Sequence, residues 1–342
     1  MFLVAKKSLA RKTAYAGGGV LAATAAFAGV LVAEAALAVR ATHQVKMPVA
    51  PSPTGWYGAR HPGRPINIAL LGDSSAAGYG MSEVEDTPGA VLASGVSEKA
   101  HRPVRLHDLS EIGAKSSDLH PQVEKAIAAD ADIAVILVGS NDVIRRVRPT
   151  VAVSHLAQAV TRLQEAGVRV LVGTVPDLST ATPILPPLRS IMRAWSIRIA
   201  AGQTFHVIRA GGHTVSLGDV LGPAFKATPA FWFGADLFHP SAAGYHALGE
   251  VLVPPTLTVL GLVGDENAIL ETYNGKQVMP LAAASLRAVI KPGTEIDPAP
   301  RPRGRVGRNW ARARSFDNEQ REPRRGERPA ETPPLVEQQR AR

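Results

Sequence analysis

Short apolar runs alternate with longer segments of helical spacing through the middle of this chain. Each apolar run ends near a glycine or a polar residue, as a buried strand does. The expected strands are Ile66–Leu71, Val104–Leu109, Ile133–Val138, Val168–Val172 and Phe205–Ile208. The expected helices are Ser117–Ala129, Val151–Ala166, Leu188–Ala201 and Ser241–Val253. This alternation predicts an α/β fold, with a parallel sheet of about five strands and helices on both faces.

Prolines modify the pattern in two places. Pro254-Pro255 is expected to stop or kink the helix that begins at Ser241, because proline removes a backbone donor and crowds the preceding turn. The apolar Thr256–Leu262 is then expected to restart a short helix, and Leu281–Ile290 to form another. Residues 176–187, which include Pro183 and Pro186, read as a long irregular loop of the kind that shapes substrate pockets.

An almost wholly apolar segment, residues 14–39, follows four basic residues within residues 1–12. Its apolar run up to Ala33 is about 20 residues, enough to span a bilayer as a helix, whereas a cleavable signal has a core of roughly 7–15. We therefore expect a signal anchor, or a signal peptide if one of the small-x-small sites is cut. Both alternatives export everything after residue 40. The expected location is the cell membrane with the catalytic domain outside the cytoplasm, or secretion.

The formal net charge of +9 at pH 7 is concentrated at the two ends of the chain. Residues 1–12 carry +4, and residues 301–342 carry twelve arginines against six acidic residues, so residues 13–300 are left at −1. A near-neutral body argues against a nucleic-acid partner. The absence of cysteine excludes disulfides, thiolate metal sites and cysteine nucleophiles.

Composition divides the chain into six expected segments. They are a basic cytoplasmic segment (1–12), the signal anchor or signal peptide (13–40), a Pro/Gly-rich tether (41–65), a catalytic domain (66–264), a helical extension (265–290) and a disordered tail rich in Arg, Pro and Glu (291–342).

Three short polar segments, called islands below, contain the candidate catalytic residues. Each falls where an expected strand ends or a helix begins. Gly72-Asp73-Ser74 offers a hydroxyl nucleophile, and Gly139-Ser140-Asn141-Asp142 offers an amide donor for an oxyanion. Asp236 and His239, three residues apart, offer a carboxylate that orients an imidazole base. Gly113, after the second expected strand, can add its backbone N–H. Each island alone is also an ordinary turn or helix cap, but together and in this order they predict acyl transfer through a serine.

On these residues the chain resembles an SGNH hydrolase, the GDSL-type esterase and lipase superfamily. The first block reads Gly-Asp-Ser-Ser, so Ser75 departs from the commonest form, and no Gly-x-Ser-x-Gly elbow occurs. The resemblance implies a flavodoxin-like three-layer α/β/α fold and hydrolysis without a metal or other cofactor. The implied roles are a Ser74–His239–Asp236 triad, an oxyanion hole of Ser74, Gly113 and Asn141, and supporting carboxylates at Asp73 and Asp142.

Several alternatives stay open at this point. The expected substrate is an ester-bearing small molecule, a lipid or an acylated glycan, so the enzyme is an esterase or lipase, or else an acyltransferase or deacetylase of envelope glycan. A non-catalytic envelope binding module is the third alternative. Trp195 and Phe231-Trp232-Phe233 either line an acyl-binding wall or simply pack in the core. The stretch Asp118-Leu119-His120-Pro121 resembles the one that contains Asp236 and His239. His120 is nevertheless expected to be a helix residue and not a base.

Overall fold

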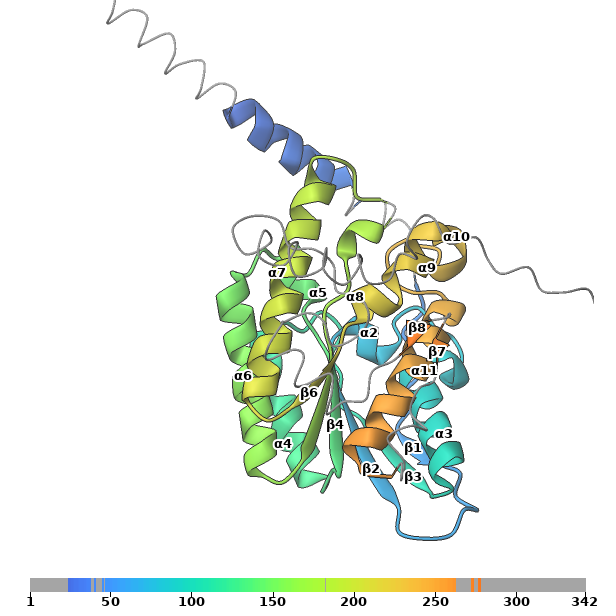
Figure 1. Cartoon of the computed structure of the whole chain (residues 1–342). Helices are drawn as coiled ribbons and strands as arrows, with labels where there is room; N and C mark the ends of the chain where they lie inside the picture. Colours follow the sequence, from blue (N-terminus) through green and yellow to red (C-terminus); the bar gives the residue numbers. More distant parts are fainter. Residues whose placement is uncertain are drawn as a thin grey trace, which may run out of the picture. The chain divides into compact units, whose positions relative to one another are not determined.

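The computed structural model describes residues 24–37, 40, 45, 47–181 and 183–262, together with the backbone of 272–273 and 276–277. The expected basic segment 1–12, the helix Leu281–Ile290 and the tail 291–342 lie outside these residues. Figure 1 shows a central sheet with helices on both sides.

A six-stranded sheet forms the middle layer, with strand order β1-β3-β2-β4-β5-β6. The strands are β1 (Gly55–Tyr57), β2 (Ile66–Gly72), β3 (Val104–Asp108), β4 (Ile133–Leu137), β5 (Arg169–Gly173) and β6 (His213–Val215), and a separate pair is β7 (Thr272–Tyr273) with β8 (Lys276–Gln277). From β3 to β6 all neighbours are parallel, and β1 pairs antiparallel with β3 at the edge. The predicted five-stranded parallel sheet is therefore confirmed, and the antiparallel edge strand is an addition.

The helices connect and cover these strands. They are α2 (Ser74–Ala77), α3 (Pro88–Ala100), α4 (His120–Ala128), α5 (Ser140–Ile144), α6 (Pro149–Glu165), α7 (Leu188–Arg209), α8 (Leu217–Val220), α9 (Gly222–Ala227), α10 (Pro229–Trp232) and α11 (Ala242–Val259), with the 3-10 turns η1 (Val84–Asp86), η2 (Ser116–Asp118) and η3 (Leu178–Thr180).

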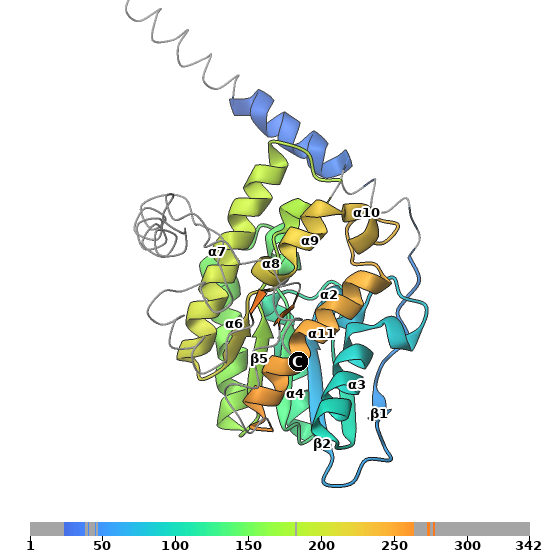
Figure 2. The same cartoon turned by 45° about the vertical axis from the view of Figure 1, so that its right-hand side comes forward.

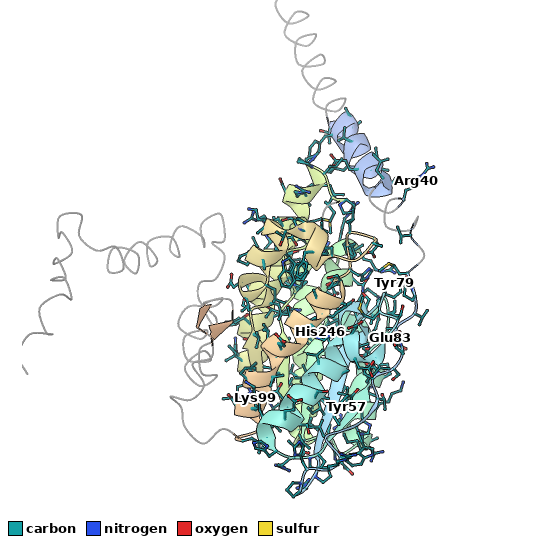
Figure 3. All side chains as sticks on the ribbon, turned by 90° about the vertical axis from the view of Figure 1, so that its right-hand side faces the viewer. Arg40, Tyr57, Tyr79, Glu83, Lys99 and His246 are labelled. Atoms are coloured by element: carbon teal, nitrogen blue, oxygen red, sulfur yellow. The ribbon has the colours of Figure 1, made fainter. Side chains whose placement is uncertain are left out.

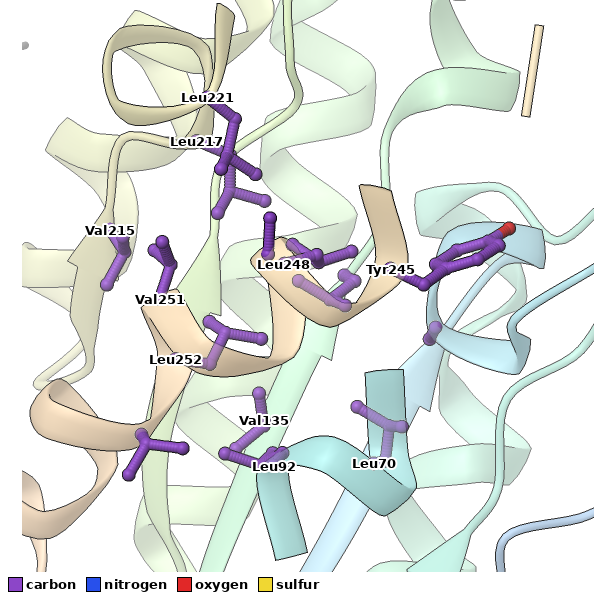
Figure 4. Close-up of a cluster of buried hydrophobic side chains, with 14 of the residues drawn as sticks. Leu70, Leu92, Val135, Val215, Leu217, Leu221, Tyr245, Leu248, Val251 and Leu252 are labelled. Carbon is purple, nitrogen blue, oxygen red and sulfur yellow. The ribbon is translucent and has the colours of Figure 1, made fainter. Parts of the chain in front are cut away.

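Alternate side chains of the strands enter two separate cores, one on each face of the sheet, because successive residues of a strand point to opposite sides. On one face, Leu70 and Val135 pack with Leu92 of α3 and with Leu248 and Leu252 of α11 (Figure 4). On the other face, α4, α6 and α7 bury a second apolar cluster against the same strands. The two sets of helices lie on opposite sides of the sheet in both Figure 1 and Figure 2. The expected three-layer α/β/α fold is confirmed.

Glycines let α3 and α11 approach each other closely. A Cβ on Gly249 would lie 2.6 Å from the Cβ of Val91, and one on Gly95 would lie 2.6 Å from Cγ2 of Val253. Figure 3 views this side of the molecule, with Lys99 labelled on α3 and His246 on α11. The imidazole of His246 lies 3.1 Å from the carboxylate of Asp86 and ties α11 to the turn before α3.

The strand expected at Phe205–Ile208 is wrong, because these residues form the last turns of α7. The sixth strand is β6 (His213–Val215), which begins directly after Gly211 and Gly212. Val207 is fully buried against the sheet. A short apolar run has the same appearance in a buried strand and on the inner face of a helix, so periodicity cannot separate the two.

The expected stop at Pro254-Pro255 is also wrong, since α11 continues through both prolines to Val259, while the alternative of a kink stays a prediction. The expected restart at Thr256–Leu262 is largely the continuation of that same helix. Pro255 and Thr256 are buried, and the Thr258 hydroxyl donates to the Pro254 carbonyl at 3.0 Å. The stability gained by packing this helix against the core outweighs the loss of two backbone N–H donors. Tertiary packing is also the main source of stability for most helices in proteins.

The segment expected to be a tether, residues 41–65, enters the domain. It contains β1, and the Tyr57 hydroxyl donates to the Pro53 carbonyl at 2.7 Å. Strand β1 was not predicted, because it is only three residues long and lies among prolines and glycines. Helix α3 was likewise not predicted.

Residues 24–37 form a helix within the segment expected to be a signal anchor or signal peptide. The Leu188 N–H donates to the Glu34 carboxylate at 2.9 Å, and Leu31 and Ala35 are partly buried against the core. No helix in the described part of the chain combines the length and the hydropathy needed to cross a membrane.

Candidate active site

Three neighbouring strands deliver the predicted site residues to one edge of the sheet. Ser74 follows β2, Gly113 lies in the loop after β3, and Asn141 follows β4, and β2 lies between β3 and β4. The carboxyl ends of parallel strands share an edge, and the crevice where the connections diverge is the usual ligand site of such sheets. Figure 1 shows α2, α5 and α8 at this same end of the sheet.

Ser74 is held at the first position of α2 by the two residues before it. Gly72 has φ of 137°, and a Cβ there would lie 1.9 Å from the Leu137 carbonyl oxygen, so the turn requires glycine. Asp73 caps α2 by accepting from the Ser75 N–H at 2.8 Å. As a result Ser74 sits on a fixed turn, and the residue is only 8% exposed.

His239 lies between Ser74 and Asp236. Its Nε2 is 3.2 Å from the Ser74 Oγ, and its Nδ1 is 2.6 Å from Oδ2 of Asp236. The turn between the two residues places Leu237 at a φ of 56°, and Asp236 Oδ1 accepts from the N–H groups of Phe238 and His239. The acid, the imidazole and the hydroxyl therefore form one continuous hydrogen-bonded series, which is the geometry that activates a serine.

The surroundings keep Asp236 ionised. Burial alone raises the pKa of this carboxyl, but hydrogen bonds from the His239 ring and from the Phe238 and His239 backbone outweigh burial and hold the pKa below its ordinary value. The Tyr79 ring lies against the imidazole at 4.7 Å between centroids. An ionised carboxylate at Nδ1 fixes the ring orientation and stabilises the imidazolium.

The three residues expected to donate to the oxyanion, Ser74, Gly113 and Asn141, all line one pocket. The Ser74 N–H belongs to the first turn of α2, where no intrahelical acceptor exists. Gly113 has φ of 85°, and beyond its two chain neighbours no atom lies within 4 Å of where its Cβ would be, so the Cβ side of this residue is open. The Asn141 amide donates to the Ala114 carbonyl at 3.0 Å, which holds the amide beside the Gly113 loop.

The two expected supporting carboxylates have different partners. Asp73 stabilises the Ser74 turn, as predicted. Asp142 does not bind the Asn141 side chain: its Oδ2 accepts from both the N–H and the hydroxyl of Ser116, at 2.9 and 2.8 Å. It therefore connects α5 to the loop that carries Gly113. Burial raises the pKa of Asp142, and the Ser116 hydrogen bonds oppose that rise.

Two buried glutamines, which the sequence reading missed, hold the strand ends in place. Gln122 of α4 accepts from the Gly72 N–H at 2.8 Å and donates to the Gly72 carbonyl at 3.1 Å. Gln203 of α7 accepts from the Val175 N–H at 2.8 Å and donates to the Val138 carbonyl at 2.9 Å. Each is 1% exposed. The available signal was an amide among the apolar positions of the inner face of a helix, because a buried amide requires partners.

A large, mainly apolar pocket of about 980 Å³ opens on this constellation. The expected loop 176–187 contributes to its wall, and so do Trp195 and Phe233. Phe231 is 60% exposed, and Trp232 stacks on Phe225 instead, so only part of that aromatic cluster faces the pocket. His120 begins α4, as expected.

Among the described residues, no three side chains gather as a group able to hold a metal ion. The expectation that hydrolysis needs no metal or cofactor stays a prediction.

Residues 70–247, just over half of the chain, match the GDSL-like lipase/acylhydrolase family. The chain belongs to this family. The matched region begins within β2 and ends within α11, so it contains Ser74, Gly113, Asn141 and His239. The resemblance drawn from the sequence motifs is confirmed.

Other proteins are similar to this GDSL-family chain over part of its length. The GDSL-like esterase Rv1075c of Mycobacterium tuberculosis (strain ATCC 25618 / H37Rv) is 37% identical over 189 residues, which are 55% of this chain and 60% of that protein. The aligned part thus spans less than two thirds of the relative. The crystal structure of TesA has a TM-score of 0.48 and 20% identity, covering 57% of this chain and 99% of that one. Axe2, an acetylxylan esterase from Geobacillus stearothermophilus, has a TM-score of 0.43 and 17% identity, covering 57% and 94%.

Proposed function

We propose that this protein is a serine esterase that hydrolyses carboxylic esters through an acyl-enzyme on Ser74. The observation that carries the proposal is the unbroken series Ser74 Oγ, His239 and Asp236, with contacts of 3.2 and 2.6 Å. This series faces a pocket large enough for a small molecule, since ligand pockets usually enclose about 300–1,000 Å³. Family membership supports the same reaction class.

The reaction divides into two half-reactions. Ser74 Oγ attacks the acyl carbon while His239 Nε2 takes the hydroxyl proton, and the oxyanion accepts from the Ser74 and Gly113 N–H groups and the Asn141 amide. The ester C–O bond breaks, and His239 passes the proton to the departing alcohol. Water then attacks the acyl-enzyme with His239 again as base, which releases the acid and restores the Ser74 hydroxyl.

The pocket lining supports an ester with an apolar acyl chain. Leu217, Leu221, Phe225 and Leu248 all contribute to the wall. Apolar surface of this kind binds hydrocarbon better than it binds the hydroxyl groups of a sugar polymer. Among the alternatives considered from sequence, this favours an esterase or lipase over an enzyme acting on envelope glycan, and the arranged triad favours an enzyme over a binding module.

The decisive test replaces the nucleophile. Ser74→Ala should lower kcat/KM for p-nitrophenyl butyrate by at least about 10³-fold, because the acyl-enzyme cannot form. It should also abolish labelling by a fluorophosphonate, while the thermal unfolding midpoint stays within a few degrees. Ser52→Ala, at an exposed serine outside the pocket, is the matched control. Retained turnover or labelling in Ser74→Ala would refute the proposal.

We also propose that the catalytic domain works outside the cytoplasm. Support comes from the sequence, in which basic residues precede the apolar segment 14–39, and from the exposed apolar side chains of Phe27, Val32 and Leu37 on the helix of residues 24–37. In cells whose wall has been opened but whose membrane is intact, added protease should degrade the domain. In cells with an intact wall, the domain should be protected. Full protection until the membrane itself is lysed would contradict an exported location.

A further inference from the structure

Two arginines line the pocket without a counter-charge. Apart from Asp236 and His239, the charged side chains of the lining are Arg145, Arg146 and Asp177. Asp177 already has partners, since its carboxylate lies 3.5 Å from Arg193 and accepts from the Ser179 N–H at 3.0 Å. No ion pair in the described part of the chain involves Arg145 or Arg146. The pocket therefore keeps positive charge that a ligand can neutralise.

The backbone of Arg146 adopts a conformation that favours glycine over other residues. Helix α5 ends in two hydrogen bonds, from the Val147 N–H to the Asp142 carbonyl at 2.8 Å and from the Arg146 N–H to the Val143 carbonyl at 3.1 Å. This is the glycine-type helix ending, and Arg146 occupies its left-handed position with φ of 54°. An L-residue there costs about 1 kcal/mol relative to glycine. Such an outlier at a site motivates a functional hypothesis about its side chain.

The oxyanion donor lies in α5, and the two arginines follow directly at its carboxyl end. Asn141 lies in its first turn, and Arg145 follows four residues later, about 6 Å farther along the axis. Between them Ile144 also lines the pocket, and Ile112 lines it from the loop of Gly113. Along the pocket lining, apolar Ile144 thus stands between the Asn141 amide and the two arginines in the sequence.

We propose that the esters hydrolysed at this site carry an anionic group, a carboxylate or phosphate, which Arg145 and Arg146 bind while it stays chemically unchanged. This proposal rests on the proposed esterase function and adds the charge of its substrates. A guanidinium offers paired N–H donors that match the two oxygens of such a group. The anionic group belongs either to the alcohol or to the acyl part of the ester, and the two positions are separable by experiment.

The test compares kcat/KM of the full chain for two pairs of esters that differ only in charge. The first pair is 3-carboxyphenyl hexanoate and 3-carbamoylphenyl hexanoate, with the charge on the alcohol part. The second is the monophenyl ester of adipic acid and its ω-amide, with the charge on the acyl part. We expect the anionic member to be preferred roughly five- to tenfold in one of the pairs, and the preference to fall as salt is added.

Variants then assign the preference to the arginines. Arg145→Gln and Arg146→Gly should each reduce the ratio of anionic to neutral turnover, and the double variant should bring it close to one. Arg148→Gln removes the same charge three residues past Arg145, from an exposed position outside the pocket, and should leave the ratio unchanged. Arg146→Gly should also unfold at the same or a higher temperature, because glycine accepts the left-handed conformation. A lower ratio in that variant therefore cannot come from lost stability.

The outcomes separate this proposal from the one on which it rests. Equal turnover of charged and neutral esters by the wild-type chain, or a preference that survives in the double variant, overturns the role of the arginines while the esterase function stands. Absence of Ser74-dependent turnover of all four esters overturns the esterase function, and the substrate proposal with it.

Discussion

At the scale of single residues, Asp73 couples the stability of the fold to pH. Burial, opposed by hydrogen bonds from Ser75, raises its pKa from 3.8 to about 6. The folded state thus binds one more proton than the unfolded state between about pH 4 and 6, and this contribution to stability is lost as pH rises through 6. The loss amounts to roughly 3 kcal/mol at neutral pH.

Asp73→Asn removes that titration. The difference in unfolding free energy between variant and wild type should shift in favour of the variant by about 2 kcal/mol from pH 4.5 to pH 7.5, as measured by urea unfolding at both values. Asp130→Asn, at an exposed turn, serves as control. An unchanged difference at the two pH values would show that Asp73 does not titrate in this range.

Individual residues were predictable where a motif requires a particular chemistry. Ser74, His239 and Asp236 follow from their order and spacing, and the structure brings them within hydrogen-bond distance. The partner of Asp142 was not predictable, because Ser116 lies 26 positions away and only the folded loops bring them together. Pairings of this kind depend on side-chain geometry that spacing alone does not contain.

At the scale of secondary-structure elements, Gln203 fastens α7 to the ends of β4 and β5. Replacement by leucine keeps a similar volume but leaves the Val175 N–H and the Val138 carbonyl buried without partners. We expect Gln203→Leu to lower the unfolding free energy by about 2–4 kcal/mol, since each unsatisfied group costs about 1–3. Gln164→Leu is the matched control, because Gln164 makes one hydrogen bond, to the Gly211 carbonyl, at an exposed position. Equal losses in the two variants would refute the proposed clamp.

Elements were predictable where length and pattern agree, and the exceptions have a common cause. The central strands β2 and β4 are apolar and buried on both faces, so their sequence admits few other structures. The end of α7 and the passage of α11 through Pro254-Pro255 depend instead on packing against the sheet and α3. Local sequence contains no information on that packing, and so the predicted strand at Phe205–Ile208 and the predicted stop at Pro254-Pro255 were wrong.

At the scale of the whole molecule, the pocket draws its wall from across the described chain, from Ala35 near the beginning to Leu248 in α11. Its position at the carboxyl edge of the sheet followed from the fold class. Its apolar character did not, because Met47, Ile191 and Leu217 belong to segments that meet only after folding. The size and polarity of the pocket are thus properties of the assembled layers.

The apolar wall makes a prediction about chain length. In a series of p-nitrophenyl esters from acetate through butyrate and hexanoate to octanoate, kcat/KM should rise until the pocket is filled. Each buried methylene contributes up to about 0.8 kcal/mol, or up to roughly fourfold. Ile191→Trp, at a half-buried residue of the lining, should shorten the preferred chain, because the larger ring occupies space that the acyl chain needs. Val151→Trp, at an exposed position of α6 outside the pocket, should leave the preference unchanged. Rates that are flat or fall from acetate onward in the wild-type chain would mean that the acyl group does not bind in this pocket.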